Sequence, residues 1–137
     1  GLDIQTRNAI WTLLHDLQAK HRLTIVLTTH YLDEADSADS VFVVDQGRVI
    51  AHGTAAAIKV KYAPDQLRIT PVDSEQLRAQ LAQHTFTVEN GDFIFEIRTA
   101  QEALKLLTKN QTLIQNFQVR PGTMNDAFIA LTGKEVR

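Results

Sequence analysis

The chain has 137 residues, of which 44% are apolar and 22% charged, with only six Gly and three Pro. This composition is typical of one globular domain or two small ones, and it excludes fibrous and disordered classes. The net charge of -2 argues against broad electrostatic capture of nucleic acid, so no nucleic-acid partner is expected. The absence of Cys excludes disulfides and thiolate metal sites. Because the first residue is Gly1 rather than Met, we expect a piece of a longer protein.

Residues 4–19 are predicted to form an amphipathic helix, with Asp3 placed to accept a backbone N–H bond at its start. Its apolar stripe consists of Ile10, Leu13, Leu14 and Leu17. Residues 23–28 are short, apolar and β-branched without clean alternation, which predicts a strand buried on both faces of a parallel sheet. His30 would then follow the carboxyl end of that strand, where open parallel sheets bind ligands.

A short helix over residues 31–38 is expected next, followed by a second buried strand at residues 41–44. The turn at Asp45 to Arg48 predicts a hairpin with Val49 to Ala51. Thr54 then caps a helix that ends near Tyr62. The buried character of the strands at 23–28 and 41–44 predicts self-association of the chain through this half.

Pro64 marks the best domain boundary, so the sequence predicts two domains, residues 1–62 and 63–137. The second region reads β-α-β-β-α-β, which is the ferredoxin-like order, and Thr99 is predicted to cap its second helix. A final helix is predicted to start at Thr123, with Met124 and Ala127 in its apolar stripe. Asn90-Gly91 predicts a two-residue hairpin turn that pairs Val88 with Phe93 and Phe86 with Phe95, so that four apolar side chains share one face. We therefore expect Phe93 and Phe95 to pack in a core rather than to stack on RNA bases.

Several short motifs occur in one order and at compact spacing. They are Gly1-Leu2-Asp3, Thr28-Thr29-His30, Asp45-Gln46-Gly47-Arg48-Val49, Gly53-Thr54, and Arg120 to Phe128 followed by Leu131-Thr132-Gly133. The ordered set resembles the carboxyl-terminal third of an ATP-binding-cassette (ABC) transporter ATPase of the drug-exporter-like subfamily. The resemblance implies an α/β fold: the C-terminal portion of a P-loop NTPase core, then a small α+β ferredoxin-like accessory domain with a C-terminal helix.

The resemblance also implies site residues and partners. Gly1, Leu2 and Asp3 would belong to the D-loop at the nucleotide-bound dimer interface, and His30 would be the switch histidine that contacts the γ-phosphate. The whole protein would bind ATP and Mg, hydrolyse ATP as one of two identical subunits, and drive export through a transmembrane permease. Its expected location is the cytoplasmic, inner face of the cell membrane. No metal ligand in this chain is implied.

Two features depart from the family pattern. Asn125 stands where an acidic residue is usual, and the sequence contains no G-x-x-x-x-G-K-[ST] loop. The Walker B and signature motifs are absent as well, so we expect this chain alone to hydrolyse no ATP and to hold no cofactor. The alternative interpretation is a free-standing regulatory module that binds a small ligand between its Phe-rich sheet and the helices near residues 74–83 and 100–110.

Overall fold

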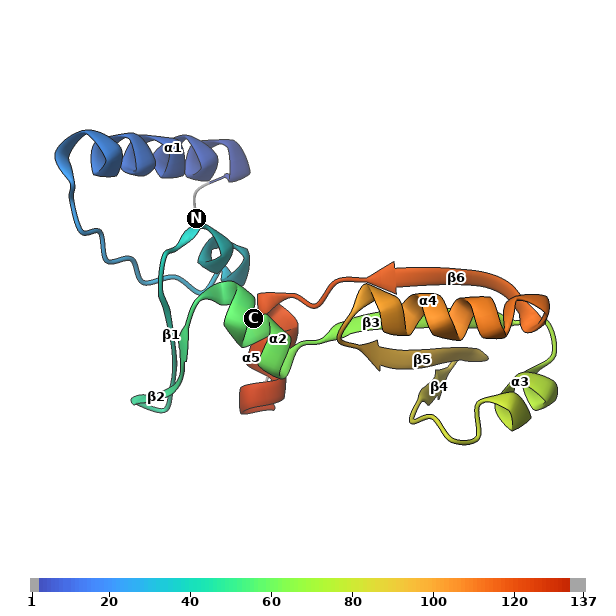
Figure 1. Cartoon of the computed structure of the whole chain (residues 1–137). Helices are drawn as coiled ribbons and strands as arrows, with labels where there is room; N and C mark the ends of the chain where they lie inside the picture. Colours follow the sequence, from blue (N-terminus) through green and yellow to red (C-terminus); the bar gives the residue numbers. More distant parts are fainter. Residues whose placement is uncertain (1–2, 134–137) are drawn as a thin grey trace. The chain divides into compact units, whose positions relative to one another are not determined.

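The computed structural model describes residues 3–133, and the chain divides after His30 into two compact units (Figure 1). Together they contain α-helices, two antiparallel sheets and a helix at the carboxyl end of the described chain. No described helix has both the length and the apolar character that a membrane span requires.

The first unit consists of helix α1, Ile4–His21, and an irregular segment of residues 22–30. The predicted helix is confirmed and extends two residues further, ending at Arg22 in a left-handed conformation with φ 51°. None of the residues of α1 is buried. Ile10 and Leu13 of the predicted stripe are 40% and 57% exposed. Leu14 and Leu17, the other two residues of the stripe, are half-buried.

The predicted strand at residues 23–28 is wrong. These residues have no regular secondary structure, and Val26 is 89% exposed. β-Branched side chains favour extended backbone, but a strand forms only when a neighbouring strand accepts its hydrogen bonds. The two sheets of the described chain contain no strand from this segment.

The second unit begins with a small cluster of elements around one hydrophobic core. Turn residues Gln46 and Gly47 have φ 50° and 74°, as a type I′ hairpin requires, so the predicted hairpin is confirmed. The elements are η1 (Leu32–Ser37), β1 (Val41–Asp45), β2 (Arg48–Gly53), α2 (Ala55–Tyr62) and α5 (Met124–Thr132). Lys59 and Asp36 form an ion pair of 2.7 Å between the helix α2 and the 3₁₀ helix η1.

Helix α5 comes from the far end of the sequence, yet it packs on α2 and η1. Its buried residues Met124 and Ala127 join a core with Val43, Ala55 and Ile58. The N-terminal and C-terminal parts of this unit therefore share one hydrophobic cluster. The division into domains between residues 62 and 63 stays a prediction. Helix α5 lies after this boundary in the sequence but packs on α2, which lies before it.

The rest of the unit is a four-stranded sheet with its helices, and along the chain the elements follow the predicted order of strand, helix, strand, strand, helix, strand. They are β3 (Asp65–Pro71), α3 (Ser74–Gln80), β4 (Thr87–Glu89), β5 (Asp92–Ile97), α4 (Ala100–Lys109), η2 (Gln111–Leu113) and β6 (Ile114–Arg120). In the sheet the strands lie in the order β4-β5-β3-β6, and every neighbouring pair is antiparallel.

One face of this sheet forms a core of its own. Leu67, Ile69, Leu77, Leu81 and Phe93 are each at most 1% exposed. The predicted register is confirmed where Val88 pairs with Phe93. Phe86 lies just before β4 and reaches the core through ring contacts with Phe93 (4.8 Å) and Phe95 (5.3 Å).

Val88 pairs with Phe93 and so shares its face, as predicted, but it is not part of the core. Val88 is 46% exposed, because β4 is only three residues long and lies at the edge of the sheet. Phe93 and Phe95 are 1% and 3% exposed, so both pack inward as expected.

Candidate functional site

The residues singled out by the motifs lie in two places: at the two ends of the first unit and at the start of α5. His30 ends the first unit and its side chain is exposed. The imidazole is therefore not enclosed in a core, and it lies where a ligand from solvent can reach it. The strand that was expected to place it at a sheet edge is not formed.

Asp3 is the N-cap of α1, and its Oδ1 accepts a hydrogen bond of 2.7 Å from the backbone N–H of Thr6. The backbone and side-chain hydrogen bonds from Thr6 hold the pKa of Asp3 below its usual value. The carboxylate thus has a local structural role as a helix cap. Gly1 and Leu2, the other two predicted D-loop residues, lie outside the described residues.

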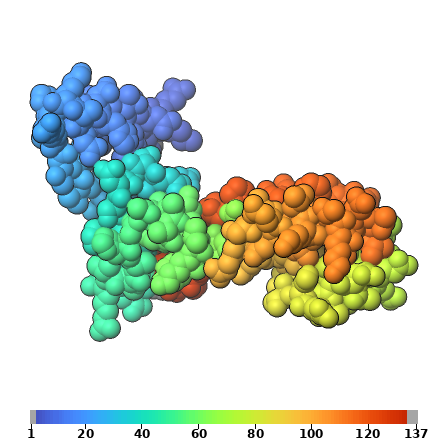
Figure 2. Space-filling model, in the orientation of Figure 1, coloured from blue at the N-terminus to red at the C-terminus, as the bar shows by residue number. Residues whose placement is uncertain are grey.

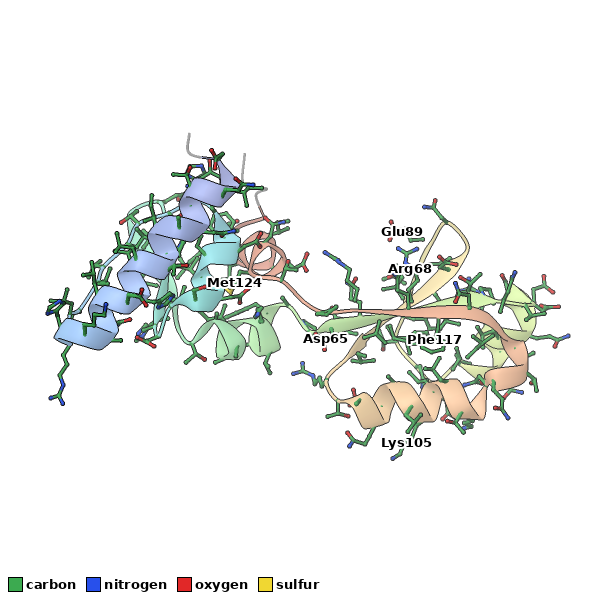
Figure 3. The ribbon with its side chains drawn as sticks, turned by 90° about the horizontal axis from the view of Figure 1, so that it is seen from above. Asp65, Arg68, Glu89, Lys105, Phe117 and Met124 are labelled. Atoms are coloured by element: carbon green, nitrogen blue, oxygen red, sulfur yellow. The ribbon has the colours of Figure 1, made fainter. Side chains whose placement is uncertain are left out.

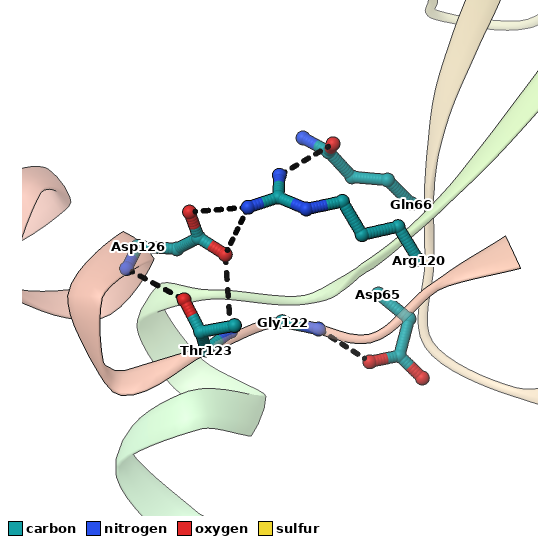
Figure 4. A network of polar contacts seen from close by, with 6 residues as sticks. All are labelled: Asp65, Gln66, Arg120, Gly122, Thr123 and Asp126. Atoms are coloured by element: carbon teal, nitrogen blue, oxygen red, sulfur yellow. Dashed lines mark hydrogen bonds and ion pairs between the residues drawn. The ribbon is translucent and has the colours of Figure 1, made fainter. Parts of the chain in front are cut away.

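The second place is the motif from Arg120 to Phe128, whose polar contacts are drawn in Figure 4. The hydroxyl of Thr123 accepts a bond from the N–H of Asp126 (3.1 Å), and the carboxylate of Asp126 accepts one from the N–H of Thr123 (3.0 Å). This reciprocal capping box fixes the first turn of α5.

Arg120 ties the same carboxylate to the end of β6. Its guanidinium donates to both oxygens of Asp126, at 3.1 and 3.2 Å, and to the side-chain oxygen of Gln66 at 3.5 Å. Partial burial acts to raise the pKa of Asp126, but the hydrogen bonds with Thr123 and the charge of Arg120 outweigh it, and the pKa lies below its usual value. Asp126 is therefore an ionised carboxylate with two independent tasks.

Gly122 lies at the point where two segments of the chain cross. Its N–H donates to the carboxylate of Asp65 at 2.9 Å, which ties the end of β6 to the start of β3. A Cβ at Gly122 would overlap the carbonyl group of Ala63. The glycine is required by this close approach of two backbones rather than by a positive φ.

The apolar residues of the motif complete the site. Met124 is 2% exposed and Ala127 is fully buried, both against the cluster around α2. Asn125, the residue that departs from the family pattern, is exposed. Asp126 is the one acidic residue of the motif in this chain. The motif as a whole connects the last residue of β6 to α5, which packs on α2.

The tie between Arg120, Thr123 and Asp126 is the feature that sequence reasoning missed. The helix start at Thr123 was predicted, and the spacing Thr-x-x-Asp was the signal for the reciprocal cap.

A second missed network lies on the open face of the sheet. There Arg68 donates to Asp92 (2.9 Å) and Glu89 (3.1 Å), and Thr70 donates to Asp92 (2.8 Å).

These contacts have electrostatic consequences. The hydrogen bond with Asp92 raises the pKa of Arg68, and the bond from Arg68 lowers that of Asp92. Both groups therefore stay charged near neutral pH, as a structural ion pair. Each titratable residue of this network already has a partner of opposite charge or a hydroxyl donor, so the network does not form a catalytic pair.

The remaining histidines do not assemble a metal site. His52 stacks on Phe42 with ring centroids 4.0 Å apart and contacts the hydroxyl of Ser40 at 3.2 Å. The ring of His15 lies 5.5 Å from that of Trp11. Within residues 3–133 no group of three or more His, Asp or Glu side chains is arranged to hold a metal ion.

The space where the alternative interpretation would put a small ligand is filled. Leu67, Leu77 and Phe93 occupy the region between the sheet and its helices and are at most 1% exposed. An open depression of about 210 Å³ does exist elsewhere, beside α5, and it includes Tyr62, Glu96 and Asp126 in its lining. The carboxylate of Asp126 in this lining is already engaged by Arg120.

Comparison with known proteins places these features in a family. A model of the family described as "ATP-binding protein DrrA1-3-like, C-terminal domain" matches residues 53–132, from the end of β2 to the end of α5. That range is more than half of the chain and contains both the sheet and the Arg120–Phe128 motif.

Curated relatives match nearly the whole chain. A daunorubicin/doxorubicin resistance ATP-binding protein DrrA of Streptomyces peucetius is 33% identical, covering 97% of this chain and 44% of its own length. Nod factor export ATP-binding proteins I of Burkholderia lata and Ralstonia nicotianae are each 34% identical, covering 100% of this chain and 45% of their own length. The chain thus spans less than half the length of these relatives. It belongs to the DrrA1-3-like family of ABC ATP-binding proteins and corresponds to their C-terminal part.

Proposed function

We propose that this chain is the C-terminal part of the ATP-binding subunit of an ABC exporter, a protein that couples ATP hydrolysis to transport across a membrane. The observation that carries the proposal is the family match over residues 53–132, because that segment contains the motif that ties the sheet to α2. The relatives named above are ATP-binding proteins of drug resistance and Nod factor export, which supports export as the direction.

The proposal gives His30 the role of contacting the γ-phosphate of ATP. A neutral imidazole offers one N–H donor to a phosphate oxygen and one acceptor nitrogen, so it can both report the phosphate and orient the attacking water. The exposure of His30 is compatible with that role. Asp3, with Gly1 and Leu2, would line the interface to the second ATPase subunit and couple the two nucleotide sites.

Residues 3–133 show no cluster of side chains that would hold magnesium. Mg²⁺ prefers several oxygen ligands, and no group of three or more candidate ligands exists among the described residues. When bound in the whole protein, Mg²⁺ would neutralise phosphate charge, and its ligands would come from outside this chain. We accordingly expect no ATP turnover and at most weak Mg-ATP binding by the 137 residues alone.

We further propose that residues 65–120 form a ferredoxin-like accessory domain and that residues up to Tyr62 complete a P-loop NTPase core. The strand order and antiparallel pairing support the first assignment. The exposed apolar residues of α1 and of residues 23–27 support the second, since the rest of such a core would cover them. In the absence of that cover they offer a surface for self-association of the chain. The whole protein would lie at the cytoplasmic face of the membrane, bound to a permease.

A chimera tests the proposal. This chain replaces the corresponding C-terminal 44% of the Streptomyces peucetius relative, and Mg-ATP hydrolysis and binding are measured separately. We expect the chimera to hydrolyse ATP and the His30→Ala variant to lose at least about 100-fold in rate while still binding nucleotide. His15→Ala, an exposed histidine on α1, is the matched control and should leave the rate unchanged. A His30→Ala chimera with full activity would remove the proposed role.

A further inference from the structure

Strand β6 lies at one edge of the four-stranded sheet, so its outer side is available to a further strand. Within the described chain it pairs with β3 alone. The N–H of Phe117 donates to the side chain of its own neighbour Asn116 at 2.9 Å, so it points away from β3. Because peptide groups alternate along an antiparallel strand, that of Val119 points outward as well.

The composition of β6 leaves this edge open to pairing. It is seven residues long, contains no Pro, and has Arg120 as its only charged residue. The guanidinium of Arg120 is held by Asp126 and Gln66. The opposite edge, β4, is only three residues long and contains the charged Glu89. Long, uncharged edges are the ones that add a strand from another chain, and short charged edges resist it.

Apolar side chains lie next to the open edge. Phe117 and Val119 are 53% and 45% exposed, although both belong to the face that carries the core, opposite Ile69 and Leu67. Figure 3 shows Phe117 on the α4 side of the sheet and Arg68 on the other side. Leu104 of α4 is 64% exposed and lies one turn from Leu107, which packs on the core. The surfaces of α4 and β6 adjoin in Figure 2.

We propose that two copies of this chain pair through β6, antiparallel and about a two-fold axis, to form one continuous sheet of eight strands. Gln118 would lie on the axis, opposite Gln118 of the partner subunit. Phe117 would then lie opposite Val119 of the partner subunit, twice, and these aromatic and β-branched pairs stabilise antiparallel sheets. Each Arg120 would lie opposite an Asn116 of the partner subunit, so no like charges meet.

We infer that the strand added at the β6 edge is β6 of a second copy, because this strand is complementary to itself in this register. Outward peptide groups at residues 117 and 119 meet each other, as hydrogen-bonded pairs require, and apolar residues face apolar ones. Centring the axis on Phe117 instead would place Gln115 opposite Val119 and lose that match. A two-fold contact of one patch with itself is the commonest interface of homo-oligomers. The pairing does not depend on nucleotide, so it stands or fails independently of the proposed ATPase function.

Cysteine cross-linking tests the register directly, since the native sequence has no cysteine. Residues that face each other without exchanging hydrogen bonds have Cα atoms about 4.5 Å apart, which is within disulfide range. Under mild oxidation of the full 137-residue chain, Gln118→Cys should give a covalent dimer as the main product. Thr87→Cys, on the exposed opposite edge, should stay monomeric, with at least about tenfold less dimer. Both sites are exposed, so neither variant perturbs the core.

Charge substitutions test the same contact at equilibrium, with sedimentation velocity as the readout. Val119→Lys should weaken dimerisation at least about tenfold, whereas Val88→Lys, at an equally exposed position on the opposite edge of the sheet, should leave it unchanged. A chain that stays monomeric with Gln118→Cys overturns the proposal. So does faster cross-linking of Phe117→Cys than of Gln118→Cys, or an association abolished by Val88→Lys and unaffected by Val119→Lys.

Discussion

Helices α1 and α5 begin with equally well-formed caps but differ in what they bury. Asp3 caps α1 through Thr6, and Thr123 caps α5 in a reciprocal box with Asp126. α1 has 18 residues and buries none of them, while α5 has nine and buries Met124 and Ala127. Local sequence signals are therefore sufficient to start a helix, but the free energy of packing depends on which other elements the chain brings to it.

The largest expected effect is the loss of stability when a buried side chain of α5 is shortened. Met124→Ala should lower the free energy of unfolding of the second unit by about 2–5 kcal/mol, because it leaves a cavity beside α2. Leu13→Ala, at a 57% exposed position of α1, should change stability by about 0.5 kcal/mol or less. Urea denaturation monitored by hydrogen exchange measures the free energy of unfolding of the second unit. The fluorescence of Trp11, the only tryptophan of the sequence, reports on α1. Equal losses for the two variants would show that α1 is as firmly packed as α5.

The crossing of the two backbones gives the next effect. Gly122→Ala should destabilise the second unit by about 1–3 kcal/mol, because the added Cβ overlaps Ala63 and pushes α5 away from α2. Asn125→Ala, at an exposed neighbouring position, is the control and should be close to neutral. Hydrogen exchange of α5 locates the change. Unaltered protection of α5 in Gly122→Ala would contradict the close approach.

Removal of the caps sharpens the comparison further. Thr123→Ala should cost about 1 kcal/mol of global stability in the second unit, since α5 belongs to its core, and Thr123→Ser should restore most of it. Asp3→Ala should instead loosen only the first turn of α1. Thermal unfolding and residue-level exchange separate the two outcomes, and a global loss from Asp3→Ala would mean that α1 has packing partners of its own.

Acid should produce the smallest effect. The pKa of Asp126 is lowered in the folded state, so the ionised form stabilises the fold above the unfolded pKa of about 3.9. This contribution is lost as the pH falls from there through the lower, folded value. Acid unfolding of the second unit should therefore begin below about pH 4, and Asp126→Asn should flatten its pH dependence. Circular dichroism between pH 5 and pH 2 checks this, with Asp33→Asn, an exposed residue of η1, as control.

Most elements could be predicted because their signals are local. The capping residues Asp3, Thr99 and Thr123, the Asn90-Gly91 turn and the apolar spacing of the helices depend on neighbours within a few residues. The strand expected at residues 23–28 failed for the opposite reason, since a strand depends on partners that can lie anywhere in a chain. The same limit applies to Val88, whose register was right but whose burial depended on the short β4.

The candidate site was predictable only in part. The position of His30 follows from sequence order, but the geometry around it depends on a sheet that the described residues do not form. The apolar spacing of Met124 and Ala127 indicated a buried face without saying against what. The cap formed by Asp126 could have been predicted from its spacing to Thr123, whereas its bond to Arg120 depends on how the chain turns between the end of β6 and the start of α5.

The hydrogen bond between Asp65 and Gly122 brings the first residue of the four-stranded sheet region next to the residue that leaves it. A region whose two ends meet can be added to, removed from or exchanged in a host without separating the host's own parts. Here the host parts are α2 and α5, which share one core although residues 63–123 lie between them in the sequence. The sheet is thus an insertion in a smaller unit, and joining residue 64 to residue 121 by a short linker should leave that smaller unit able to close.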